Sequence, residues 1–165
     1  SLKNMTGLLG GKYFVASVMN SAAGSLFSFL PAIIFLVAAF IGFAMGTSWG
    51  TIALILPIII GVFDAADPLF LVAVGSALAG AVYGDHISPI SDTTILSSAG
   101  AKCNHLRHVA TQIPYATLVM IVCFVGYVIA GFTKSPWISL ALGVVLIVIA
   151  VLVLVRMEAS KKAKA

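Results

Sequence analysis

The sequence predicts an all-α fold, namely a polytopic transmembrane helical bundle with a re-entrant hairpin and a broken helix. Of its 165 residues, 61% are hydrophobic and only 8% are charged, whereas a soluble domain has about 25% charged residues. Long apolar stretches that suit membrane-crossing helices are interrupted by Gly- and Pro-rich polar sequence. The composition excludes a soluble globular domain, a disordered region and a nucleic-acid-binding module, despite a formal net charge of +4.

Residues 1–29 mix Lys3, Lys12 and Asn20 with small and aromatic residues. This pattern predicts a connecting or interfacial helix rather than a full span. The chain starts without Met and lacks the basic segment, apolar segment and cleavage site of a signal peptide. We therefore expect a fragment of a larger protein whose N-terminal half is missing.

Two long apolar stretches follow, at 30–63 and 69–100. Each is longer than the roughly 20 residues of one membrane crossing and shorter than two crossings. Helix breaks are expected at 46–51 and 84–94, because glycine is a poor helix former and Pro89 has no amide hydrogen. Lipid cannot satisfy the freed backbone groups, so the two breaks should face each other, or an aqueous pocket, inside the bundle. The first stretch is either a re-entrant hairpin or two short tilted spans.

Small residues recur every four positions on the way into both breaks. They are Ala38, Gly42, Gly46 and Gly50 in the first stretch, and Ser76, Gly80 and Gly84 in the second. Such stripes let helices in a bilayer pack backbone to backbone. We expect ordinary close helix packing that also brings the two broken elements together.

The remaining apolar sequence predicts two further spans, at 109–132 and 137–155, joined by a short turn. We assign 133–156 to the last transmembrane helix and 157–165 to a basic tail. The first of these spans completes a core at 30–132 that contains both broken elements.

Charge predicts the orientation, since an excess of Lys and Arg marks cytoplasmic loops. The 102–107 loop carries Lys102 and Arg107, whereas the link at 64–68 carries only negative charge. The C-terminus is also basic, with Arg156, Lys161, Lys162 and Lys164. We expect a multi-pass protein of the plasma membrane whose C-terminus is cytoplasmic.

Asp85 and Asp92 are the main candidates for a functional site. A carboxylate at bilayer depth costs several kcal/mol, roughly, unless it is paired, hydrated or protonated. Hydroxyl groups surround the two aspartates, namely those of Ser88, Ser91, Thr93 and Thr94. Carboxylate, hydroxyl and carbonyl oxygens are the ligands of a hard cation, so we expect a sodium site at Asp85 and Asp92. Burial also favours the protonated carboxyl, so a proton can replace the departing cation.

The alternative is a polar surface loop in which the aspartates are helix N-caps, and Asp92 does precede a helix-like segment. The hydroxyls of Thr47, Ser48 and Thr51 at the first break either complete the cation shell or cap half-helices. His86 is a candidate proton relay or pH sensor, or a neutral hydrogen-bonded residue at the break. We expect His105 to be a solvated residue of the basic loop.

Two motifs resemble the signature of Na⁺/H⁺ antiporters of the NhaC type. They are Gly46-Thr-Ser-Trp-Gly-Thr51 and Gly84-Asp-His-Ile-Ser-Pro-Ile-Ser-Asp-Thr-Thr-Ile-Leu-Ser-Ser98. The likeness continues through His105 and Thr111-Gln-Ile-Pro-Tyr115, covering roughly residues 30–132. It implies a larger secondary transporter whose ion site lies at re-entrant or broken helices.

The expected function is therefore Na⁺/H⁺ antiport, as a fragment of a larger antiporter and not as an enzyme. Related motifs also occur in exchangers of organic acids or amino acids, which leaves a cation-coupled exchanger of that kind open. A non-transporting membrane subunit and an intramembrane hydrolase with paired carboxylates are further alternatives. No cofactor is expected beyond the transported Na⁺ and H⁺. The expected partners are the lipid bilayer and the missing N-terminal half; a homo-oligomer is left open, and no nucleic acid is expected.

Overall fold

The computed structural model describes residues 27–162, and every regular element in that range is an α-helix. The six helices are α4 (Leu30–Met45), α5 (Ser48–Val62), α6 (Pro68–Ile87), α7 (Asp92–Gly100), α8 (His105–Thr133) and α9 (Pro136–Lys162). The all-α prediction is confirmed for this part of the chain. The connecting helix predicted for 1–29 lies almost entirely outside the described residues.

The first predicted break is confirmed, and it is short. Helix α4 ends at Gly46, whose φ of 64° lies in the left-handed region that glycine adopts readily. Thr47 is extended and is the N-cap of α5, so only these two residues separate the helices. With 16 and 15 residues, α4 and α5 form a helical hairpin whose arms are each shorter than the roughly 20 residues of a full crossing.

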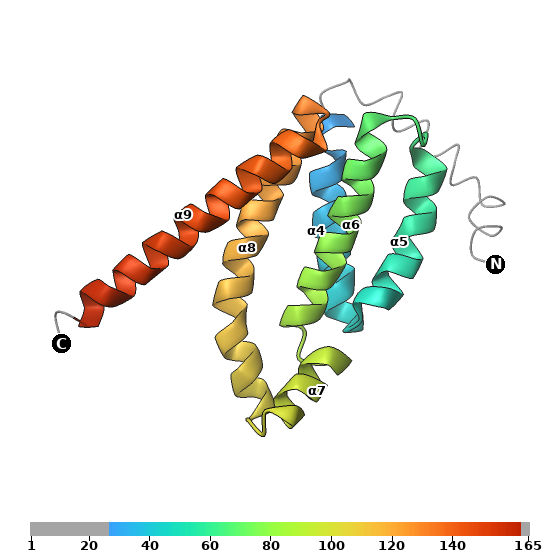
Figure 1. Ribbon diagram of the computed structural model, residues 1–165. Coiled ribbons are helices and arrows are strands. Elements are labelled where there is room, and N and C mark those ends of the chain that lie inside the picture. Colours follow the sequence, from blue (N-terminus) through green and yellow to red (C-terminus); the bar gives the residue numbers. More distant parts are fainter. Residues whose placement is uncertain (1–26, 163–165) are drawn as a thin grey trace.

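Helices α4 and α6 lie side by side with their backbones in close approach (Figure 1). A Cβ atom added at Gly42 would lie 2.7 Å from the carbonyl oxygen of Ala81. One added at Gly80 or Gly84 would collide with the carbonyl oxygen of Phe35 or Ala39. The small-residue stripes therefore face each other, as the sequence predicts.

Apolar side chains complete the packing of the hairpin against α6. The hydrophobic core contains the buried residues Ala38, Ile55, Ile59, Phe63, Leu69, Ala73 and Ala77. These residues come from α4, α5, the end of α5 and α6, so both arms of the hairpin are fixed to the same helix. Close packing of these apolar side chains fixes the position of the hairpin relative to α6.

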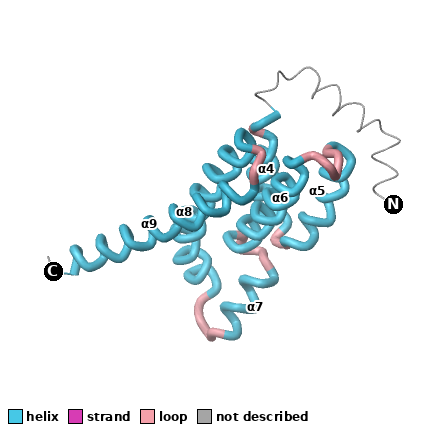
Figure 2. Tube along the Cα trace, turned by 45° about the horizontal axis from the view of Figure 1, so that its top comes forward, coloured by secondary structure: helices cyan, strands magenta, loops and turns pink. Residues whose placement is uncertain are grey.

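The second predicted break is also confirmed, in a narrower form than 84–94. Helix α6 continues through Asp85 to Ile87, and the chain leaves helical geometry only at 88–91 before α7 begins. Ser91 is the N-cap of α7, where its side chain accepts a hydrogen bond from the amide of Thr94. In Figures 1 and 2, α7 is a short helix between the end of α6 and the start of α8.

The connections divide between the two ends of the bundle (Figure 1). The acidic link at 64–67 and the junction between α8 and α9 lie at one end. The turn after α4, the break after α6 and the basic loop before α8 lie at the other end. Helix α9 then leaves α8 at an angle, and the predicted spans at 109–132 and 137–155 fall within α8 and α9.

Helix length and hydropathy identify two candidate membrane spans within residues 27–162. They are α6, with 20 residues, and α8, with 29 residues. Helices α4 and α5 and the segment Leu140–Val153 are apolar but shorter. The described residues thus contain fewer candidate spans than the polytopic bundle that the sequence predicts.

Candidate functional site

A buried carboxylate lies one turn before the second break. Asp85 is only 1% exposed, and both of its carboxylate oxygens face hydroxyl groups from the start of α7. The Ser91 hydroxyl donates to Oδ1 at 2.6 Å, and the Thr93 hydroxyl lies 3.3 Å from Oδ2. The hydroxyl oxygens of Ser91 and Thr93 are 2.7 Å apart. We call these three residues the Asp85 cluster.

The cluster contains two short oxygen–oxygen contacts and a longer one of 3.3 Å, but its two hydroxyl groups supply only two protons for these three contacts when Asp85 is ionised. A proton on Oδ2 completes the set: Asp85 donates to Thr93, Thr93 to Ser91, and Ser91 to Oδ1. Without that proton, the cluster offers a carboxylate and hydroxyl lone pairs, which are ligands for a hard cation. The same atoms therefore suit either a proton or a cation.

Ser88 connects the second break to the first. Its side chain is fully buried, and its hydroxyl donates a 2.8 Å hydrogen bond to the carbonyl oxygen of Phe43 in the last turn of α4. A Cβ atom at Gly46 would lie 2.9 Å from the backbone of Ile90. The prediction that the two breaks face each other is thus confirmed.

The two predicted sodium-binding aspartates lie in different environments. Asp92 is exposed, and its Oδ1 accepts a 2.8 Å hydrogen bond from the amide of Thr93. The helix start expected at Asp92 is correct, although the capping side chain is that of Ser91. Thr94 is buried and donates its amide hydrogen to Ser91 at 3.3 Å, which joins it to the Asp85 cluster through the backbone.

The hydroxyls of the first break serve as local caps. Thr47 accepts a hydrogen bond from the amide of Gly50 at 3.4 Å. Thr51 is fully buried and donates to the carbonyl oxygen of Thr47 at 2.8 Å. Ser48 is the half-buried first residue of α5. The described hydrogen bonds of Thr47 and Thr51 stay within this turn, as the capping alternative predicts.

The two histidines near the second break lie in different environments. His86 is exposed in the last turn of α6, and its Nδ1 lies 2.8 Å from the carbonyl oxygen of Val82 in the same helix. The expectation that His105 is solvated in the basic loop is wrong. It is half-buried at the start of α8, with Nε2 2.7 Å from the Pro89 carbonyl oxygen and Nδ1 3.1 Å from the Ser98 hydroxyl.

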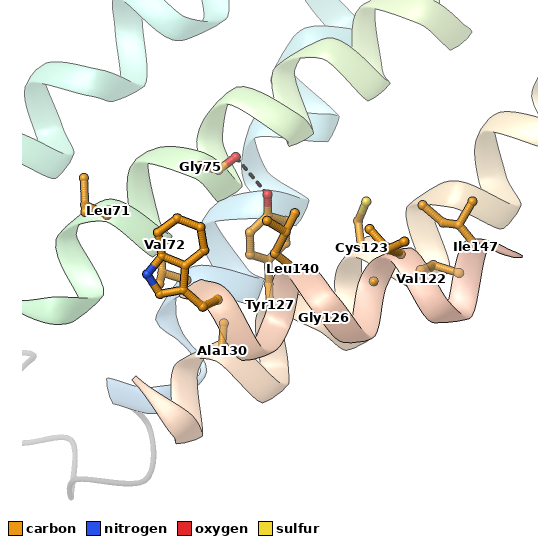
Figure 3. Close-up of a pocket in the computed structure, with 13 residues that line it drawn as sticks. Leu71, Val72, Gly75, Val122, Cys123, Gly126, Tyr127, Ala130, Leu140 and Ile147 are labelled. Atoms are coloured by element: carbon orange, nitrogen blue, oxygen red, sulfur yellow. Dashed lines mark hydrogen bonds between the residues drawn. The ribbon is translucent and has the colours of Figure 1, made fainter. Parts of the chain in front are cut away.

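An apolar cavity of about 510 Å³ lies elsewhere, between α6, α8 and α9 (Figure 3). On its wall the Tyr127 hydroxyl donates to the Gly75 carbonyl oxygen at 2.9 Å. Residues on its wall include Leu71, Val122, Cys123, Leu140 and Ile147. None of the predicted ion-binding residues lines this cavity, so it is separate from the Asp85 cluster.

Comparison with known proteins identifies the family. Residues 4–132 match the Na⁺/H⁺ antiporter family, which is more than half of the chain. The chain belongs to this family. All of the predicted site residues fall within the matching range, and so does His105. No solved structure matches the chain.

Three curated relatives show how the chain relates to longer proteins. An uncharacterised protein of Haemophilus influenzae is 48% identical over 126 residues, covering 76% of this chain and 24% of the relative. The malate-2H⁺/Na⁺-lactate antiporter of Bacillus subtilis is 32% identical over 132 residues, covering 76% of this chain and 28% of the relative. The Na⁺/H⁺ antiporter NhaC of Bacillus subtilis is 31% identical over 129 residues, with coverages of 73% and 28%. The chain thus spans between 24% and 28% of the length of these relatives.

Proposed function

We propose that the chain is part of a secondary active transporter that exchanges Na⁺ for H⁺, with Asp85 as the group that binds the two ions alternately. The observation that carries the proposal is the burial of Asp85 with both carboxylate oxygens turned to the hydroxyls of Ser91 and Thr93 at a helix break. Membership of the Na⁺/H⁺ antiporter family supports the coupling of these ions.

The exchange follows from competition for the same oxygens. In the proton-bound form the ring of hydrogen bonds through Asp85, Ser91 and Thr93 is complete. In the sodium-bound form the ion takes the carboxylate, and the two hydroxyls turn their lone pairs toward it. Asp92 is exposed at the adjacent helix start and extends the sodium site toward solvent.

The other candidate residues position the cluster. Ser88 and Thr94 fix the break and the first turn of α7, because each is buried and hydrogen-bonded there. The hydroxyls of Thr47 and Thr51 shape the tip of the hairpin through hydrogen bonds within its own turn, beside Ser48 at the start of α5. His86 is exposed one residue beyond Asp85 and relays protons between solvent and the site.

In the proposed membrane arrangement, α6 and α8 cross the bilayer, as their length and hydropathy allow. The hairpin of α4 and α5 is re-entrant, and the last transmembrane segment, proposed at 133–156, consists mainly of the first part of α9. The basic residues Lys102 and Arg107 support a cytoplasmic location for the end that carries the break. The basic tail at 157–165 is then cytoplasmic as well. The remaining spans of the full-length protein are the proposed partners of this core in the plasma membrane.

The test is the Na⁺-dependent change of pH in everted vesicles that carry the full-length protein. We expect Asp85→Asn to abolish exchange and Asp92→Asn to weaken it. The matched control is Asp64→Asn, because Asp64 is exposed in the link at the opposite end of the bundle. Normal exchange by the Asp85 variant contradicts the proposal.

A cation-coupled exchanger of an organic acid is the second candidate. The malate-2H⁺/Na⁺-lactate antiporter covers 76% of this chain at 32% identity, similar to the likeness to NhaC. Vesicles loaded with malate or lactate distinguish the two. Under the first candidate the acids leave the Na⁺-dependent pH change unaltered, whereas under the second that change requires an acid on one side.

A further inference from the structure

The four residues of the second break are held by three different helices. Ser88 is tied to α4 through the carbonyl oxygen of Phe43. Ser91 is tied to α6 through the carboxylate of Asp85. Pro89, between them, has its carbonyl oxygen 2.7 Å from Nε2 of His105 in the first turn of α8. Each anchor limits how far the break can move relative to one neighbouring helix.

The His105 ring is held on both sides. A carbonyl oxygen only accepts hydrogen bonds, so Nε2 carries the hydrogen and donates to Pro89. On the other side, Nδ1 faces the hydroxyl of Ser98, which is 2% exposed. That hydroxyl also lies 2.9 Å from the carbonyl oxygen of Ile95, so its position is fixed by the backbone of α7. The imidazole of His105, at the start of α8, therefore contacts the break on one side and α7 on the other.

We infer that His105 is a positioning residue for the Asp85 cluster. Its hydrogen bond to Pro89 fixes the break whose next turn presents the hydroxyls of Ser91 and Thr93 to Asp85. Loss of this bond frees the break on the α8 side, and the hydroxyl ligands become less well ordered around the bound cation. The inference rests on the proposed role of Asp85 in ion binding.

The test compares three replacements of His105 in the full-length protein. Glutamine carries an amide donor at the reach of Nε2, whereas asparagine reaches only as far as Nδ1. We expect His105→Ala and His105→Asn to raise the apparent KM for Na⁺ about tenfold, which corresponds to the loss of one hydrogen bond. We expect His105→Gln to stay within about twofold of the wild-type KM, because it keeps a donor to Pro89. The maximal rate per folded protein stays unchanged in all three.

The matched control is His108→Ala, which removes the same side chain one turn later in α8. A purely structural role lowers the amount of folded protein, measured by size-exclusion chromatography, without shifting the KM. A wild-type KM for His105→Ala overturns the inference, and so does rescue by asparagine but not by glutamine. If the alanine variant does not fold, the glutamine and asparagine variants decide.

Loss of exchange in Asp85→Asn together with a wild-type KM in every His105 variant refutes this inference alone. Normal exchange in Asp85→Asn refutes the proposed function.

Discussion

The hydroxyl of Ser88 donates a hydrogen bond to the carbonyl oxygen of Phe43, 45 residues earlier in the chain. Carbonyl groups in the last turn of a helix have no amide partner within that helix. The Ser88 hydroxyl supplies a donor to one such carbonyl of α4. It also joins the tip of the hairpin to the break after α6. Any movement of one break during the proposed transport therefore carries the other break with it, or breaks this bond.

Replacement of Ser88 by alanine leaves the Phe43 carbonyl without this donor. We expect Ser88→Ala to lower the free energy of unfolding by about 0.5–1.5 kcal/mol, because the protein loses one hydrogen bond between the two breaks. Thermal unfolding of the purified protein in detergent measures the effect. Ser97→Ala is the control, since the described hydrogen bond of the exposed Ser97 hydroxyl lies within α7; an equal Tm for the two variants contradicts the prediction.

The contact between α4 and α6 has no room for a side chain at Gly84. We expect Gly84→Ala to destabilise the protein by about 1–3 kcal/mol, because the new methyl group meets the backbone of Ala39 and Phe43 rather than a flexible side chain. Gly61→Ala in α5 is the control, because a Cβ atom there meets nothing within 4 Å. That control should be neutral or stabilising by up to about 1 kcal/mol. Equal shifts in Tm would show that α4 and α6 are not in backbone contact.

Tyr127 fixes α8 to α6 through its hydroxyl. Tyr127→Phe removes the hydrogen bond to the Gly75 carbonyl but keeps the ring, whose centroid is 5.4 Å from that of Phe35. We expect a loss of about 0.5–1 kcal/mol, typical of a hydrogen bond between helices in a membrane protein. Tyr115→Phe serves as the control, because Tyr115 is 60% exposed. The prediction fails if the Tm of Tyr127→Phe equals that of the control.

The two hydroxyls of the Asp85 cluster should contribute unequally to ion binding. Ser91 makes the shorter contact with Asp85 and also caps α7, so Ser91→Ala should raise the apparent KM for Na⁺ about tenfold. Thr93→Val should raise it only a few-fold, roughly, since its contact with Asp85 is 3.3 Å. Thr111→Val is the control, because its hydroxyl bonds within α8. A larger effect for Thr93 than for Ser91 would contradict this order.

Features that depend on local chemistry could be predicted from the sequence. Gly46 and Pro89 mark the two helix breaks because their backbones disfavour a continuous helix. The four-residue spacing of Gly80 and Gly84 predicts the face that contacts α4. Ser91 and Thr93 lie close enough in sequence to Asp85 for the cluster to be anticipated.

Features that depend on distant segments could not be predicted. Asp85 and Asp92 look equivalent in the sequence, but the folded chain buries the first and leaves the second exposed. His105 follows Pro89 by 16 residues, and the intervening helix α7 returns the chain to the break. No periodicity or motif spacing encodes that return.

The most direct test of the account is whether Na⁺ binding displaces a proton from Asp85. The full-length protein in detergent is titrated with Na⁺ in weak buffer, and the released protons are measured with a pH-sensitive dye. The account predicts proton release by the wild type and by Asp64→Asn, and none by Asp85→Asn. Proton release by Asp85→Asn equal to that of the wild type would contradict the central claim.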